Sequence, residues 1–200
     1  SVTNIISMTK KTEEKEALEK WKRENKDSEI ILKESSNRGT LMHGYLSEML
    51  MGKMNGELIE EVNLPKKMAE TIITHGLNDC VKEVYASEEC VYSLKYKYAG
   101  TMDALISTQE NKLQICDFKQ KNSPAKREYS SIRNYFTQCI LYAIAHNEIH
   151  GTKIQSSVIL MCTPNLIFQK FEIEGQEFMD LQKEALERVE HYHELMSQNI

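Results

Sequence analysis

The stretch GTMDALISTQENKLQICDFKQK, residues 100 to 121, decides the fold, because it predicts a β-hairpin with charged residues inside it. Two segments rich in apolar residues flank the polar turn TQENK. Side chains in a strand alternate between the two faces of a sheet, so Asp117 and Lys119 point to the same face. Burial of charge is costly unless the charge is paired, so these residues need a specific reason to be there.

The register of this hairpin brings two carboxylates together. If the turn is symmetric about Glu110, Leu105 lies opposite Ile115, and Asp103 lies opposite Asp117. Directly opposed side chains have Cβ atoms about 5 Å apart, so the two carboxylates repel each other. Either a bound cation or a shared proton must compensate for this repulsion.

A bound cation explains more of the pattern. Two carboxylates and water form a hard-oxygen site that suits Mg²⁺ or Mn²⁺ and leaves positions for a phosphate. Lys119, on the same face, can stabilise charge on the phosphorus or orient the attacking water. The pattern therefore indicates phosphodiester hydrolysis, and the alternative is an exposed Asp–Lys pair on a surface hairpin.

The rest of the chain predicts helices around one sheet. Helical periodicity and end signals mark residues 12–25, 39–52, 64–80, 133–151 and 175–196. Strand patterns mark residues 81–98, 101–107, 112–119, 153–162 and 166–173. We expect an α/β fold with a mixed central β-sheet flanked by helices. One domain, residues 1–200, would comprise a helical part to about residue 80 and a core from about residue 81.

Composition limits the class of protein. The chain has 200 residues, 40% of them hydrophobic, which is enough for one sizeable core. Its five cysteines are widely spaced and form no C-x-x-C pair, which argues against a disulfide framework and an iron–sulfur cluster. An intracellular location is therefore expected. The N-terminus turns polar too early for a secretion signal, and the apolar runs are too short to cross a bilayer, so no membrane association is expected.

Charge is distributed unevenly along the chain. The net charge is −5, so no global basic field attracts nucleic acid. Residues 112 to 133 nevertheless carry a net charge of +4 and include Lys121 and Arg133. A charge run of this kind is either a solvated face or a local contact for a polyanion.

The order Asp, turn, Asp-x-Lys resembles the PD-(D/E)xK nuclease superfamily, here as GTMD at 100–103 and DFK at 117–119. The motifs RGTLMH (38–43), YASEEC (85–90) and QCILY (138–142) are together similar to its RecB-like exonuclease branch. Within that branch, SVTNIIS, ALEKWK and RGTLMH resemble mitochondrial genome maintenance exonucleases and related phage exonucleases. The resemblance runs from residue 1 to about residue 195 and implies a restriction-endonuclease-like fold.

The resemblance implies a role for each matching residue. The metal ligands would be Asp103, Asp117, the main-chain carbonyl of Phe118, and His43. Lys119 would be the catalytic lysine, with Asp103, Asp117 and Glu88 completing the catalytic set; Glu88 is chosen over Glu89 on its spacing to Asp103. DNA contacts would come from Gln138 and Tyr142, which share a helix face, and from Lys121, Arg133 and Arg38.

The implied function is a metal-dependent DNA exonuclease that prefers single-stranded ends and acts in replication, repair or recombination. One or two Mg²⁺ or Mn²⁺ ions and no iron–sulfur cluster are expected. A monomer is expected, with a helicase or a replication or recombination protein as a partner that supplies the strand. A bacterial or phage-infected cytoplasm is favoured, and a mitochondrial location stays open. The alternatives are a flap or junction endonuclease and a non-catalytic DNA-binding module.

Overall fold

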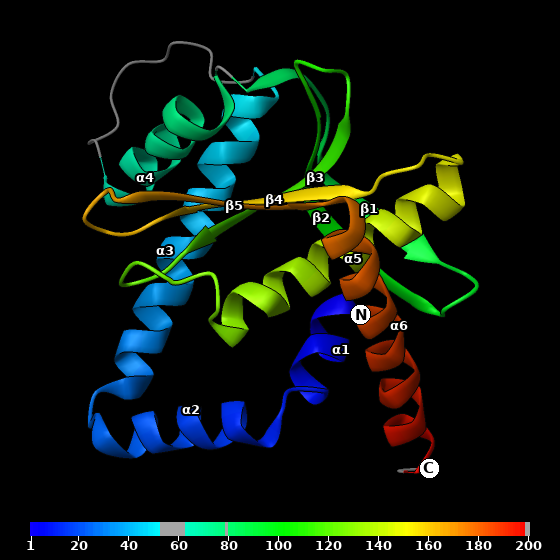
Figure 1. Cartoon of the computed structure of the whole chain (residues 1–200). Coiled ribbons are helices and arrows are strands. Elements are labelled where there is room, and N and C mark those ends of the chain that lie inside the picture. The colour runs from blue at the N-terminus through cyan, green and yellow to red at the C-terminus, as the bar shows by residue number, and fades with distance from the viewer. Residues whose placement is uncertain (53–62, 79, 199–200) are drawn as a thin grey trace.

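Five strands form one mixed sheet in the computed structural model, which describes residues 1–52, 63–78 and 80–198 (Figure 1). The strands are β1 (Val81–Ser93), β2 (Tyr98–Thr108), β3 (Leu113–Gln120), β4 (Ser156–Cys162) and β5 (Phe168–Glu174). They lie side by side in chain order, and only β3 and β4 are parallel. The expected α/β fold with a mixed central sheet is confirmed.

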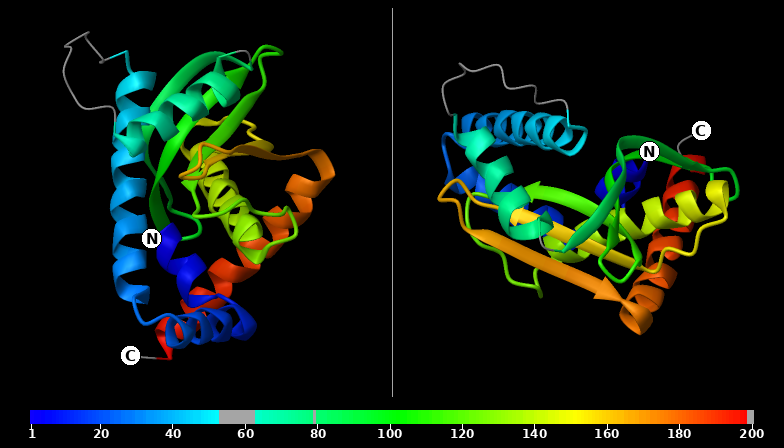
Figure 2. Two further views of the ribbon diagram at one scale, coloured as in Figure 1. Left: turned by 90° about the vertical axis from the view of Figure 1, so that its left-hand side faces the viewer. Right: turned by 90° about the horizontal axis from the view of Figure 1, so that it is seen from above.

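Helices cover both faces of this sheet. They are α1 (Val2–Met8), α2 (Thr12–Glu24), α3 (Ser28–Leu50), α4 (Leu64–Ile72) with the π-helical turn η1 (Ile73–Leu77), α5 (Ser130–His150) and α6 (Gly175–Ser197). Helix α5 connects the parallel strands β3 and β4, because a parallel pair requires a crossover. One hydrophobic cluster joins the sheet to α1, α5 and α6, and a second joins it to α3 and α4. Figure 2 shows the two layers of helices from the side and from above.

The predicted hairpin register is confirmed. Leu105 pairs with Ile115, and the ladder between β2 and β3 extends from Ser107–Leu113 to Ala104–Cys116. Asp103 and Asp117 follow directly after the last of these pairs. Both carboxylates therefore lie where β2 and β3 separate and β3 continues along β4.

Several predicted helix boundaries were wrong. Helix α3 begins at Ser28 rather than at residue 39. The sequence did not predict its first turns, because side chains there such as Ile30 are exposed and form no apolar stripe. The predicted helix over 64–80 is shorter, with Gly76 in the π-helical turn packed against Leu160; residue 79 lies outside the described residues. The short helix α1 was not predicted, although it buries Val2 and Ile5.

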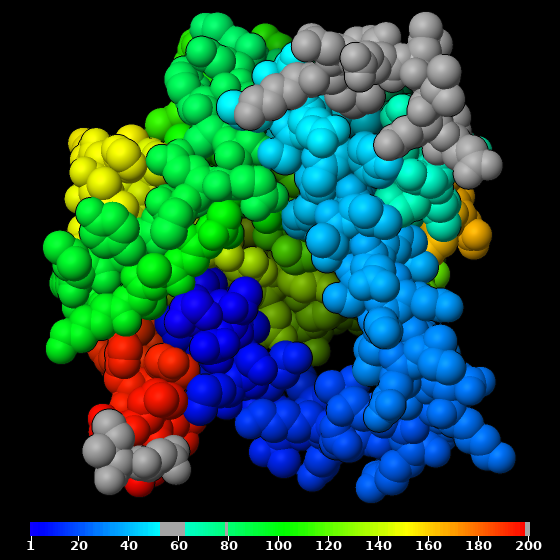
Figure 3. All heavy atoms as spheres, turned by 180° about the vertical axis from the view of Figure 1, so that it is seen from behind, coloured from blue at the N-terminus to red at the C-terminus, as the bar shows by residue number. Residues whose placement is uncertain are grey.

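The N-terminal helices form an arch beside the sheet. Helix α2 runs from α1 to the foot of α3, away from the sheet (Figure 1), and none of its side chains is buried. Seen from behind, α1, α2 and α3 border a hollow with α5 at its floor (Figure 3). A cavity of about 380 Å³ lies there between α1, α2 and the start of α5. Among the helices of the described ranges, none is long and apolar enough to cross a membrane.

Candidate active site

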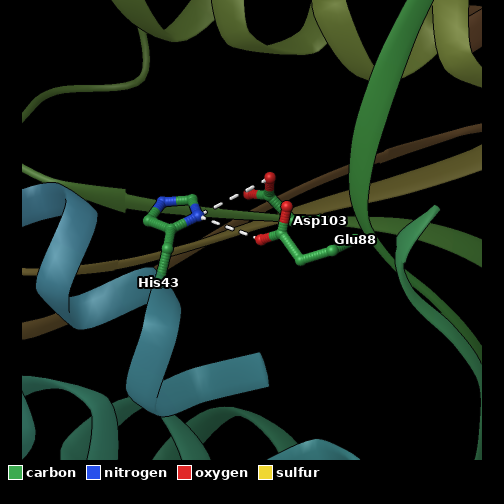
Figure 4. A group of neighbouring side chains, drawn as sticks. All are labelled: His43, Glu88 and Asp103. Atoms are coloured by element: carbon green, nitrogen blue, oxygen red, sulfur yellow. Dashed lines mark ion pairs between the residues drawn. The ribbon is translucent and has the colours of Figure 1, made fainter. Parts of the chain in front are cut away.

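Three side chains from three elements converge at one edge of the sheet (Figure 4). His43 comes from α3, Glu88 from β1 and Asp103 from β2. Nδ1 of His43 lies 3.8 Å from Oε1 of Glu88 and 3.7 Å from Oδ1 of Asp103. One ligand atom from each residue lies within 4.8 Å of the others. An imidazole and two carboxylates so close together form a donor set that suits a divalent cation.

The backbone of β3 holds Asp103 in place. Its Oδ2 accepts a hydrogen bond of 2.7 Å from the main-chain N–H of Phe118. Its Oδ1 is the oxygen nearer His43. One oxygen of this buried carboxylate is thus fixed by the sheet, and the other is directed toward the imidazole.

Asp117 and Lys119 form an ion pair beside this cluster. Nζ of Lys119 lies 2.8 Å from Oδ1 and 2.7 Å from Oδ2 of Asp117, which is wholly buried. Only Oδ1 is hydrogen bonded with good geometry, so Oδ2 is a buried acceptor without a hydrogen-bond partner. The repulsion expected from the sequence is therefore relieved within the chain, because Lys119 pairs with Asp117 and a main-chain N–H pairs with Asp103.

Burial and neighbouring charges shift the pKa values of this pair. Burial raises the pKa of Asp117 to about 7; Asp103 adds to this effect, and Lys119 opposes it. Burial lowers the pKa of Lys119, but the carboxylates of Asp117 and Asp103 outweigh it, so the net shift is upward. The Lys119 ammonium also lies 5.1 Å from the centre of the Tyr135 ring on α5. Lys119 is therefore a fixed cation between a carboxylate and an aromatic face.

The imidazole of His43 responds to the same charges. Burial lowers its pKa most, but the nearby carboxylates of Glu88 and Asp103 more than compensate, so the net shift is upward. A site that stabilises the imidazolium in this way is rich in negative charge and attracts a metal cation for the same reason.

Glu88 reaches the site through an unusual backbone conformation. Its φ is 53°, in the left-handed region that a glutamate seldom adopts. Two register shifts interrupt β1 just before it, between Val81 and Glu83 and between Val84 and Ala86. The bulged strand turns Glu88 toward His43, whereas the charge of Glu89 acts on His146 of α5.

Hydrogen bonds attach α3 to the end of β3. Nε2 of Gln120 donates to the main-chain carbonyl and the hydroxyl of Ser35, both at 2.8 Å. Oε1 of Gln120 accepts from Nε of Arg38 at 3.0 Å, and the same guanidinium donates to Asn122. Gln120 directly follows Lys119, so this contact sets the distance between His43 on α3 and the strand residues.

A groove of about 910 Å³ opens over the site between α3, β1 and β3. Its walls include His43, Glu88, Lys119 and Gln120, together with small residues of α3 such as Gly39. Tyr135 and Gln138 line the 380 Å³ cavity beneath the arch. The Lys119 ammonium, which is 5.1 Å from the Tyr135 ring, therefore lies near both hollows.

The structure distributes the predicted DNA-contacting residues unevenly. Gln138 donates a 2.8 Å hydrogen bond to the hydroxyl of Tyr142, whose ring is buried and presents no face to a base. Lys121 donates to the hydroxyl of Ser131 near the start of α5. Arg133 forms an ion pair with Glu184 of α6, away from the groove.

Arg38, although assigned to DNA, is engaged by Gln120 and Asn122 within the chain. The aromatic residue beside the lysine is Tyr135, and sequence reasoning did not connect the two. It also missed Gln120. Since Gln120 and Ser35 are 85 residues apart, no local pattern could have revealed their contact.

Solved structures match this chain at low sequence identity, and one of them, with a TM-score above 0.5, shares its fold. A protein from Eubacterium rectale described as a candidate exonuclease matches 77% of this chain at 19% identity, with a TM-score of 0.52. The chain spans 64% of the length of that protein. An alkaline exonuclease from Laribacter hongkongensis matches 78% of this chain and 83% of its own length, at 14% identity and a TM-score of 0.33. No family model and no curated protein matches the sequence.

Proposed function

We propose that this chain is a metal-dependent DNA exonuclease of the RecB-like PD-(D/E)xK type that acts on single-stranded ends. The observation that carries the proposal is the cluster of His43, Glu88 and Asp103 beside the Asp117–Lys119 pair. Isolated Asp–Lys pairs are common on protein surfaces, but this pair is buried and adjoins a set of metal-type ligands. The fold shared with the E. rectale protein is consistent with a nuclease and does not by itself specify an activity.

The donor set fits Mg²⁺ or Mn²⁺. His43, Glu88 and Asp103 would hold the ion, and Asp117 offers the buried Oδ2 that has no hydrogen-bond partner. The main-chain carbonyl of Phe118 remains a predicted further ligand. When bound, the cation supplies Lewis-acid stabilisation of charge on the scissile phosphate.

Lys119 supplies the second positive charge of the site. Its ammonium is held by Asp117 on one side and by the Tyr135 ring on the other, so it needs little reorganisation to interact with a phosphate oxygen. In this position it stabilises charge that develops on the phosphate or orients the attacking water. Hydrolysis of the P–O3′ bond would leave 5′-phosphates.

Two hollows near Lys119 suggest a path for a single strand. Lys119 lines the groove along α3, and Tyr135, whose ring lies 5.1 Å from the Lys119 ammonium, lines the cavity beneath the arch of α1 and α2. A strand that passes through both would lie near Lys121 and Gln138, whereas Arg133 would contact DNA only after leaving Glu184. A narrow path of this kind favours a free end over a duplex surface, in agreement with the net charge of −5.

Digestion of labelled DNA tests the proposal. Linear single strands carrying a 5′ or a 3′ label and a circular single strand are incubated with Mg²⁺, Mn²⁺ or EDTA. We expect loss of the linear strands only, inhibition by EDTA, and no cleavage by Lys119→Ala, which should still fold and bind DNA. Undiminished cleavage by that variant would remove the mechanism.

Cleavage of the circle would favour the flap or junction endonuclease, and no cleavage of any substrate would favour the non-catalytic DNA-binding module. A single domain, a monomeric state, an intracellular location and a helicase or recombination partner remain part of the proposal.

A further inference from the structure

Two imidazoles lie together at the C-terminal end of α5, outside the candidate active site. His146 and His150 are four residues apart on the helix, and their ring centroids are 4.4 Å apart. Figure 1 shows this end of α5, in yellow, on the opposite side of the molecule from α3. The pair takes no part in the proposed cleavage.

Neighbouring hydrogen bonds determine which nitrogen of His146 carries a proton. The amide oxygen of Asn147 accepts from the Thr152 hydroxyl at 2.7 Å and from the N–H of Ile154 at 2.8 Å. The Asn147 amide nitrogen donates to the carbonyl of Ile154, which fixes the orientation of the amide. Because the Thr152 hydroxyl proton is directed to Asn147, its oxygen accepts from Nδ1 of His146 at 2.8 Å.

Nε2 of His146 consequently carries a lone pair. It makes no hydrogen bond within the described residues, and the residue as a whole is 6% exposed. Burial lowers the pKa of His146, and the proximity of His150 adds to this effect, so the ring stays neutral. A neutral imidazole whose Nδ1–H is held by a fixed acceptor is the usual arrangement of a metal-ligating histidine.

The surroundings favour a cation. The carbonyl groups at the C-terminal end of α5 give that end a partial negative charge. The carboxylate of Glu89 on β1 also acts on His146 and raises its pKa, against the larger effect of burial. The side chain of His150 is exposed, so a rotation of its ring does not require the core to move.

We propose that His146 and His150 form a second metal site, distinct from the oxygen-rich cluster, that takes Zn²⁺, Ni²⁺ or Cu²⁺. Imidazole nitrogen suits these cations, whereas Mg²⁺ prefers oxygen ligands. Two histidines one turn apart on a helix can chelate one ion through their Nε2 atoms. Water completes the coordination.

Calorimetric titration with Ni²⁺ tests this site. The protein carries His43→Gln and Asp103→Asn, so that the first cluster does not compete. Adding His150→Gln should weaken Ni²⁺ binding by about 100-fold. The matched control is His191→Gln, which removes another exposed histidine and should leave the affinity unchanged. Equal Ni²⁺ affinity with and without His150 would overturn the proposal.

A second pair of variants tests the assigned tautomer. Thr152→Val removes the acceptor for Nδ1–H of His146 and should weaken Ni²⁺ binding by about tenfold. Thr152→Ser keeps the hydroxyl and should retain the affinity. In the protein that carries His43→Gln and Asp103→Asn, the electron paramagnetic resonance spectrum of bound Cu²⁺ should show coupling to two imidazole nitrogens. Adding His150→Gln should reduce this coupling to one nitrogen. Coupling unchanged by His150→Gln would show that other residues hold the ion.

Discussion

The two halves of the candidate active site are built differently. Asp103, Asp117 and Lys119 lie on the paired strands β2 and β3, and each is buried or nearly so beside a partner in the chain. His43 and Glu88 come from α3 and the edge strand β1, and their side chains are 27% and 43% exposed. The strand half is fixed by the sheet, whereas the outer half depends on a few long-range contacts and a strained backbone.

This difference gives the two halves different roles: the strand residues carry the charges of the site, and the outer residues can change position relative to them. The strand residues have little freedom, because the N–H of Phe118 holds Asp103 and Lys119 holds Asp117. The outer residues approach the same point from elements that can move relative to the sheet. Variants of the two halves should therefore differ in the size and the kind of their effects.

The largest effect is expected from the strand half. Asp103→Asn keeps an oxygen that accepts the N–H of Phe118 but loses the charge, so cleavage should fall by about 1,000-fold while the fold persists. His43→Gln should lower cleavage by only about tenfold. Single-turnover rates at saturating Mn²⁺ measure both losses. Equal losses would break the distinction between the halves.

Metal binding should depend on both halves, and more strongly on the strand half. At about 100 times its dissociation constant, an ion that binds only the folded chain raises the free energy of unfolding by about 2.7 kcal/mol. We expect Mn²⁺ to stabilise the unmodified protein in this way, to have no effect on Asp103→Asn and to have a reduced effect on His43→Gln. Lys119→Ala, which leaves the three ligands in place, serves as the control and should keep the stabilisation. Thermal unfolding with and without Mn²⁺ measures this stabilisation. If Mn²⁺ does not stabilise the unmodified protein, the metal proposal is wrong.

The attachment of α3 can be tested through Gln120. Gln120→Leu removes its three hydrogen bonds to Ser35 and Arg38. Displacement of His43 should then lower kcat/KM by about tenfold and weaken Mn²⁺ binding. Ser35→Ala keeps the bond to the main-chain carbonyl and is the matched control. Unchanged kcat/KM and Mn²⁺ affinity in Gln120→Leu would mean that other contacts hold α3.

The smallest effect concerns backbone strain. Asparagine tolerates the left-handed conformation better than glutamate, so Glu88→Asn should increase the free energy of unfolding by about 1 kcal/mol while slowing cleavage. Lys97, with a φ of 54° and an exposed side chain, provides the comparison: Lys97→Asn should gain stability without a loss of cleavage. Urea denaturation measures the gain. A less stable Glu88→Asn protein would show that the Glu88 side chain contributes to folding.

The strand half was predictable because its geometry is local. Two-residue alternation and a short turn were enough to establish the register of β2 and β3, which the structure confirms. The outer half was less accessible. The early start of α3 has no amphipathic signal, and its contact with Gln120 joins residues 85 apart. The basic run left two interpretations open, because a sequence does not show that Arg133 pairs with a distant acid on α6.

The length of α2 determines the width of the arch formed by α1, α2 and α3. None of its side chains is buried, so packing in the core places little constraint on its sequence. Its 13 residues set a span of about 20 Å at the helical rise. The number of residues in α2 therefore sets the distance between α1 and α3. Adding or removing a helical turn should change the width of the cavity beneath α2 and leave the core unchanged, because no side chain of α2 is buried.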